Sequence, residues 1–80
     1  MGPQPNQQTI AVIATCRSHH QAQAMAEKHG RMPGVVTATA VGNIVTFVCR
    51  VAKDSALIIY GRIKDVFPMY CTVTCRCLAD

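Results

Sequence analysis

Hydrophobic residues recur along the chain with two different spacings, and the change from one spacing to the other divides the chain into six segments. Residues 9–16 are apolar or β-branched over the length of a strand and end at the polar residues Arg17 and Ser18. Residues 35–41 and 44–51 have the same character. We therefore expect one strand near the N-terminus and two more in the middle of the chain.

A helix is predicted between the first two of these strands. Ser18 stands three residues before Gln21, which is the spacing of a capping box at a helix N-terminus. Residues at helical spacing follow, namely Ala22, Met25, Ala26 and His29. Gly30 then ends the predicted helix, and Pro33 and Gly34 turn the chain into the next strand.

The two middle strands are separated only by Gly42 and Asn43, and a two-residue connection of this kind predicts a β-hairpin. Counted outward from the turn, one face of the hairpin is wholly apolar, and we expect it to face the core: Val36, Ala38, Ala40, Val45, Phe47, Cys49 and Val51. The other face is expected to be at least partly wet: Thr37, Thr39, Thr46 and Arg50, with Ile44 and Val48.

A second helix and a last strand complete the pattern. The helix is expected to begin after Lys53, with Asp54 or Ser55 as its N-cap, and to end at Pro68. Its apolar side consists of Ile59, Ile63, Val66 and Phe67. Residues 69–78 alternate as a strand, with an inward face of Met69, Cys71, Val73, Cys75 and Cys77 and an outward face of Tyr70, Thr72, Thr74 and Arg76.

The order strand, helix, strand, strand, helix, strand is that of the ferredoxin-like βαββαβ fold. We expect a single α+β domain over residues 9–80, preceded by a flexible leader over residues 1–8. In this fold a four-stranded antiparallel sheet carries both helices on one face, with the first and third strands in the centre. The other face would then expose hydroxyl and guanidinium groups for a partner, from Thr37, Thr39, Thr46, Arg50, Thr72, Thr74 and Arg76. Alternatively, threonine simply tolerates a wet strand surface.

Composition narrows the class of protein. The chain has 80 residues, of which 50% are hydrophobic and 15% charged, so it has enough apolar residues to fold. Eight Lys and Arg against four Asp and Glu give a net charge of +4, which permits an acidic partner. We find no transmembrane span and no export signal, and five cysteines then fit free thiols in a reducing cytoplasm.

The cysteines allow three interpretations: core packing, a zinc or copper site, or redox chemistry. The possible metal ligands are Cys16, His19, Cys71, Cys75 and Cys77. Cys16 would stand just before a helix N-terminus, where the helix dipole and Arg17 favour the thiolate. The segment from Ala14 to His19 loosely resembles the metal loop of heavy-metal-associated domains, with Cys16 matching the first cysteine and His19 in place of the second.

Catalysis and base recognition have less support in the sequence. The acidic residues Glu27, Asp54, Asp65 and Asp80 form no evident catalytic pair, so we expect neither an enzyme nor a bound cofactor. RNA-recognition domains of the same fold carry stacking aromatic residues on their sheets, and this chain lacks them. Binding of a nucleic-acid backbone through basic residues stays open as an alternative.

In size and architecture, residues 9–80 resemble the anti-CRISPR proteins, small phage-encoded inhibitors with ferredoxin-like domains. The resemblance implies a non-enzymatic protein that binds a host nucleic-acid-targeting defence complex and sterically blocks its DNA-binding surface. Arg17, Arg50 and Arg76 would be the main contacts, together with the threonines of the uncovered face. The strand at residues 35–41 would be a sheet edge without inward charge or Pro, so both a monomer and an edge-paired homodimer are open.

Overall fold

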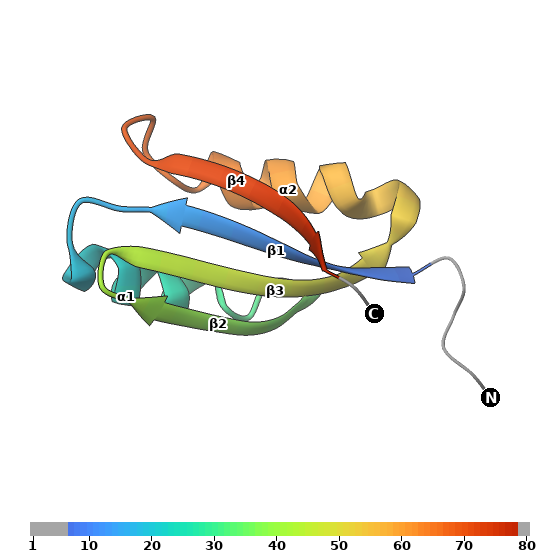
Figure 1. Cartoon of the computed structure of the whole chain (residues 1–80), viewed down its shortest axis with the longest axis horizontal. Coiled ribbons are helices and arrows are strands. Elements are labelled where there is room, and N and C mark those ends of the chain that lie inside the picture. The colour runs from blue at the N-terminus through green and yellow to red at the C-terminus, as the bar shows by residue number, and fades with distance from the viewer. Residues whose placement is uncertain (1–6, 79–80) are drawn as a thin grey trace.

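The computed structural model of the protein describes residues 7–78 as a four-stranded antiparallel sheet with two α-helices (Figure 1). The elements are β1 (Gln7–Thr15), α1 (His19–His29), β2 (Val35–Val41), β3 (Ile44–Ala52), the short 3-10 helix η1 (Lys53–Ser55), α2 (Ala56–Asp65) and β4 (Thr72–Leu78). The strand order β2-β3-β1-β4 confirms the expected α+β, ferredoxin-like arrangement, with β1 and β3 in the centre. β1 begins at Gln7, two residues before the expected start, and the rest of the expected leader lies outside the described residues.

Helix α1 begins as the sequence predicts. The Ser18 hydroxyl accepts a hydrogen bond from the Gln21 N–H at 3.0 Å, and Gln21 Oε1 accepts one from the Arg17 N–H at 3.0 Å. The second bond differs from a capping box because it goes to the residue before the N-cap. Ala22 and Ala26 are buried against the sheet, and their small side chains let α1 pack closely on it.

The turn of the β2–β3 hairpin forms at Gly42 and Asn43. Gly42 has a φ of 59°, and no described non-glycine residue has a positive φ, so glycine at the first central position fits a type II′ turn. The predicted register is confirmed from the Val41–Ile44 pair to the Thr37–Val48 pair. The pairing then shifts between Val35 and Thr37.

This shift corrects the prediction for Val36. Val35, rather than Val36, pairs with Cys49 and packs against the core, while Val36 is 62% exposed. A bulge places one extra residue on one strand, so it reverses the side on which the residues before it lie. The remaining expected core positions of β3 are buried: Val45, Phe47, Cys49 and Val51.

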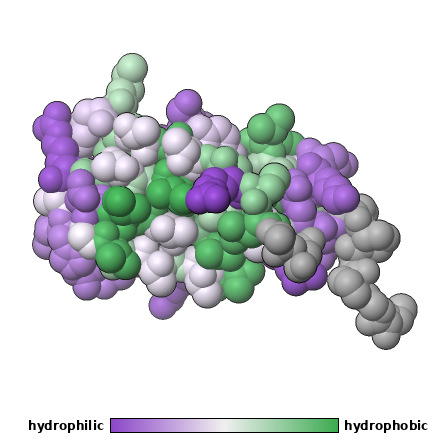
Figure 2. Space-filling view, viewed as in Figure 1, coloured by the Kyte–Doolittle hydropathy of each residue, from purple (hydrophilic) through white to green (hydrophobic). Residues whose placement is uncertain are grey.

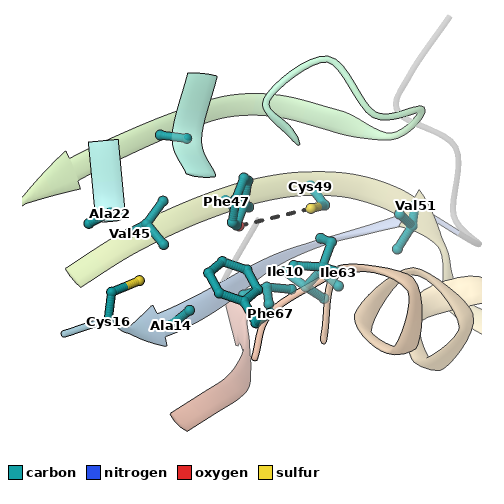
Figure 3. Close-up of a cluster of buried hydrophobic side chains, with 12 residues drawn as sticks. Ile10, Ala14, Cys16, Ala22, Val45, Phe47, Cys49, Val51, Ile63 and Phe67 are labelled. Carbon is teal, nitrogen blue, oxygen red and sulfur yellow. Dashed lines mark hydrogen bonds between the residues drawn. The ribbon is translucent and has the colours of Figure 1, made fainter. Parts of the chain in front are cut away.

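The core lies between the sheet and the two helices (Figure 3). Phe47 of β3 and Phe67, just after α2, meet edge to face with ring centroids 6.1 Å apart. Ile63 of α2 is fully buried beside them, and Ile59 and Val66 are packed against the same cluster. The residues of the predicted apolar side pack against the core as expected, although the helix begins after η1 and Ser55 makes no side-chain cap bond. The helix also ends at Asp65 instead of at Pro68, so Val66 and Phe67 lie just after it.

The last strand is shorter than expected. β4 begins at Thr72, and Met69 and Tyr70 lie in the preceding turn, where Met69 is fully exposed instead of inward. Among the described strands, β4 is an edge strand paired with β1 alone, and α2 reaches it through the Tyr60 hydroxyl, which donates to the Val73 carbonyl at 3.0 Å. No helix in residues 7–78 is long and apolar enough to cross a membrane.

Candidate functional site

The sheet face that the helices leave uncovered is the main candidate surface, and we call it the open face. It consists of the β1 residues Thr9, Ala11, Ile13 and Thr15, the β2 residues Thr37, Thr39 and Val41, the β3 residues Ile44, Thr46, Val48 and Arg50, and the β4 residues Thr72, Thr74, Arg76 and Leu78. The strand registers thus bring together every threonine and two of the three arginines that the sequence suggested for partner binding.

Threonines form a row across the middle of the open face. Thr39 pairs with Thr46, Thr46 with Ile13 and Ile13 with Thr74, so three hydroxyl groups and one aliphatic side chain lie on a line over all four strands. The Thr74 hydroxyl donates to the Ile13 carbonyl at 3.5 Å, a long bond that leaves its lone pairs free. A row of this kind can both donate and accept hydrogen bonds.

The open face is also more apolar than the sequence analysis expected. Val41, Ile44 and Leu78 are 77%, 41% and 37% exposed, and Ile13 and Val48 are half-buried beside them. Figure 2 shows this face, in the orientation of Figure 1, as green and pale areas with separate purple areas among them. Only Ile44 and Val48 were expected here from the sequence, although strict alternation also puts Val41 beside Thr39.

The charge of the open face is positive. Arg50 lies opposite Thr9 and donates to the Gln7 side chain at 3.4 Å, and Arg76 lies opposite Ala11 on the neighbouring edge strand. The acidic residues of the described chain are Glu27 in α1, Asp54 in η1 and Asp65 at the end of α2. Within residues 7–78 the strands therefore carry cations without acidic neighbours on the same face.

Arg17, the third predicted contact, does not lie on a strand. It follows β1, and its guanidinium stands 3.7 Å above the ring centroid of Tyr70, in the connection before β4. The Tyr70 hydroxyl accepts a hydrogen bond from Gln21 Nε2 at 2.6 Å. These contacts join the connections before α1 and before β4. No pattern in the sequence indicates them, because Arg17 and Tyr70 are distant along the chain.

The cysteines divide between core and surface. Cys16 and Cys49 are buried, Cys71 is half-buried, and Cys75 and Cys77 are exposed. All three C-terminal cysteines lie on the core side of the sheet, as predicted. Cys71, just before β4, packs against the core, but Cys75 and Cys77 on the edge strand β4 are exposed and are not core residues. Burial raises the pKa of the Cys16 thiol, so the expected activation of a thiolate at this position is wrong.

The suggested metal ligands do not converge on one site, although Cys16 and Cys71 are neighbours. His19 Nδ1 lies 2.7 Å from the Gly42 carbonyl, at the β2–β3 turn, whereas Cys71 lies beside Cys16 at the start of β4. Within residues 7–78 no group of three or more His, Cys, Asp or Glu side chains is placed to hold a metal ion. Comparison of the chain with protein-family models, with curated proteins and with solved structures gives no match.

Proposed function

We propose that the protein is a non-enzymatic binding module that uses its open face to cover a surface of a larger protein. The observation that carries this proposal is the composition of that face: a row of hydroxyl groups, two cations and exposed aliphatic side chains on a four-stranded sheet. Apolar contacts supply most of the free energy of association, and hydrogen bonds and charges select the partner. The open face offers all three kinds of contact on one continuous surface.

The charge of the face favours an acidic partner. Arg50 and Arg76 lie on strands on either side of β1, and no acidic residue of the described strands lies beside them. Arginine binds carboxylates with two parallel hydrogen bonds and is enriched among the residues that dominate binding energy. A carboxylate-rich surface is thus the chemistry that this face would recognise.

We extend the proposal to the class of target on the resemblance in size and architecture to anti-CRISPR proteins. We propose that the partner is a nucleic-acid-targeting complex and that binding blocks it sterically, because a four-stranded sheet can cover part of one protein surface. Blocking by imitation of DNA is disfavoured, since the chain carries a net charge of +4. Direct binding of a nucleic-acid backbone is the competing account, and it predicts a steep dependence on salt.

The test compares two double variants with the same change of charge. Arg50→Glu/Arg76→Glu reverses both cations of the open face, while Lys28→Glu/Arg62→Glu reverses two exposed cations on α1 and α2. Each variant is first shown to fold by circular dichroism. The wild type and both variants are then used to capture partners from host lysate, and the captured complex is purified for titration calorimetry.

We expect the complex to bind the wild type and the helix variant alike and to bind the open-face variant at least about 100-fold more weakly. Two like-charge contacts at an interface cost several kcal/mol, and about 1.4 kcal/mol corresponds to a tenfold change. Equal binding by all three proteins would exclude the open face as the interface. Two results together would show that the partner is a nucleic acid instead of a protein. Nuclease treatment of the lysate would abolish capture, and the protein would bind short duplex DNA at low salt but release it at raised salt.

A further inference from the structure

Cys16 and Cys71 stand opposite each other at one end of the sheet. The antiparallel pairing of β1 and β4 runs from Thr9–Leu78 to Thr15–Thr72. The next residue on each side is a cysteine, so the same register places Cys16 across from Cys71. The side chains of both cysteines lie on the core side of the sheet, like those of the neighbouring pair Ala14 and Val73.

Hydrogen bonds show how the backbones of the two cysteines are oriented. The Cys16 N–H donates to the Asn43 carbonyl at 2.7 Å, which lies on the β3 side of β1. The Val73 carbonyl accepts from the Tyr60 hydroxyl at 3.0 Å, so it points away from β1. The Cys71 N–H donates to the Pro68 carbonyl at 3.0 Å in the turn before β4, so it is not directed to β1 either.

Such an arrangement is a non-hydrogen-bonded antiparallel pair. In these pairs the Cα atoms are about 4.5 Å apart and the side chains approach closely. A disulfide requires Cα atoms about 4.4–6.8 Å apart. Continued by one residue beyond Thr15–Thr72, this register brings the Cα atoms of Cys16 and Cys71 within the range that a disulfide requires. By contrast, Cys75 and Cys77 are neighbours on one side of a single strand, about 7 Å apart, which is at or beyond that limit.

The two thiols differ in how easily a reagent reaches them. Cys16 is 5% exposed and closes the end of the core beside Ala14 (Figure 3). Cys71 is half-buried and lines an open cavity of about 330 Å³ between the end of α2 and the start of β4. Burial first, and then the neighbouring Cys71 thiol, raises the pKa of Cys16. Of these two thiols, Cys71 is the more exposed, so a dissolved oxidant reaches it before it reaches Cys16.

We propose that Cys16 and Cys71 form a reversible intramolecular disulfide in the folded protein, with a small-molecule disulfide such as oxidised glutathione as the oxidant. The Cys71 thiolate attacks one glutathione sulfur, which forms a mixed disulfide and releases one glutathione thiolate. The Cys16 thiolate then attacks Cys71 Sγ and releases the second glutathione. Two protein thiols are oxidised, one glutathione disulfide is reduced to two thiols, and the two protons pass to the released thiolates.

The bridge would fix the connection before β4 to the connection before α1. In the reduced protein these connections are joined by the Gln21–Tyr70 hydrogen bond and by Arg17 on the Tyr70 ring, both at exposed positions. A covalent link beside them would hold the start of the edge strand in place. This inference does not rest on the proposed function, because neither cysteine belongs to the open face.

The experiment uses full-length protein with the two exposed thiols removed, Cys75→Ser/Cys77→Ser, beside the wild type. Each protein is equilibrated without denaturant in buffers of graded reduced and oxidised glutathione, quenched with acid and alkylated. Intact mass gives the number of thiols left, and trypsin separates Cys16, in residues 1–17, from Cys71, in residues 65–76. Cys71→Ser in the same background is the matched control, and its fold is checked by circular dichroism.

We expect the folded double variant to lose two of its three thiols and to yield the two tryptic peptides as one disulfide-linked species. In denaturant, the equilibrium constant for bridging should fall by about three orders of magnitude, as expected for a loop of about 55 residues. The Cys71→Ser control should form no intramolecular bridge. The proposal would be overturned if all three thiols remained, or if only glutathione adducts or linked dimers formed. It would also be overturned if the equilibrium constant for bridging were less than about tenfold higher in the folded protein than in denaturant.

Discussion

The aromatic pair Phe47 and Phe67 should dominate the stability of the domain. Phe47 is fully buried in the central strand β3, and its ring meets Phe67 at 6.1 Å with an interplanar angle of 72°. Removal of a buried Phe side chain to Ala costs about 3–5 kcal/mol. A chain of this size unfolds with about 4–12 kcal/mol, so Phe47→Ala would leave a marginal protein. Leucine is the better probe, because it keeps most of the apolar volume and removes only the ring.

We expect Phe47→Leu and Phe67→Leu each to lower the free energy of unfolding by about 1–2 kcal/mol. The double variant should lose less than the sum of the two, by about 0.5–1.5 kcal/mol, since either change alone already breaks the edge-to-face contact. Urea unfolding followed by far-UV circular dichroism measures this, because the chain has no Trp to report by fluorescence.

Val48 provides the control for this double-mutant cycle. It follows Phe47 directly but lies half-buried on the open face, so Val48→Thr should cost less than about 1 kcal/mol. Additivity of the two Phe changes within about 0.3 kcal/mol would show that the rings do not interact. A cost at Val48 equal to that at Phe47 would show that the faces of the sheet are assigned wrongly.

Three further predictions test separate features of the fold. The bulge exposes Val36 and turns Val35 toward the core. In the same urea assay, Val35→Ala should therefore lower the free energy of unfolding by about 1 kcal/mol and Val36→Ala by less than about 0.5 kcal/mol. The reverse order would show that β2 and β3 pair without a bulge. Ser18→Ala should lower the free energy of unfolding by about 1 kcal/mol, because it removes the hydrogen bond that caps α1. Ser18→Asp keeps an acceptor and should recover most of this loss. An unchanged stability of Ser18→Ala in thermal or urea unfolding would argue against the cap bond. Burial lowers the pKa of His29 below its usual value near 6.5, so the unfolded chain binds the proton more readily than the folded protein does. The free energy of unfolding should therefore fall as pH decreases from 7 through 6, and it should fall less in a His29→Gln variant. NMR titration of the His29 ring checks the cause, and an unshifted pKa would contradict it.

The proposed binding surface and the proposed disulfide occupy different parts of the molecule. The open face depends on the registers of all four strands, which fix Arg50 and Arg76 on the same side. Cys16 and Cys71 lie at the end of the sheet, where the connections before α1 and before β4 meet. A change in one of them can therefore be made and measured without touching the other.

Local signals in the sequence were sufficient for the order of elements and for much of the open face. Alternation gives the side of a strand on which each residue lies, and the two-residue turn at Gly42 fixes which residues of β2 and β3 pair. These two signals alone place Thr37, Thr39, Thr46 and Arg50 on one face of the hairpin. The Ser18 cap likewise depends only on neighbours along the chain.

Tertiary packing decided what lies above each face and which distant residues meet. Alternation places Cys75 and Cys77 on the core side, but both lie on the edge strand β4 and remain exposed there. The bulge at Val36 was hidden because two adjacent valines satisfy either register equally. The contacts of Arg17 with Tyr70 and of Cys16 with Cys71 join segments more than 50 residues apart. No local pattern encodes such pairs, because they arise only when β4 takes its place beside β1.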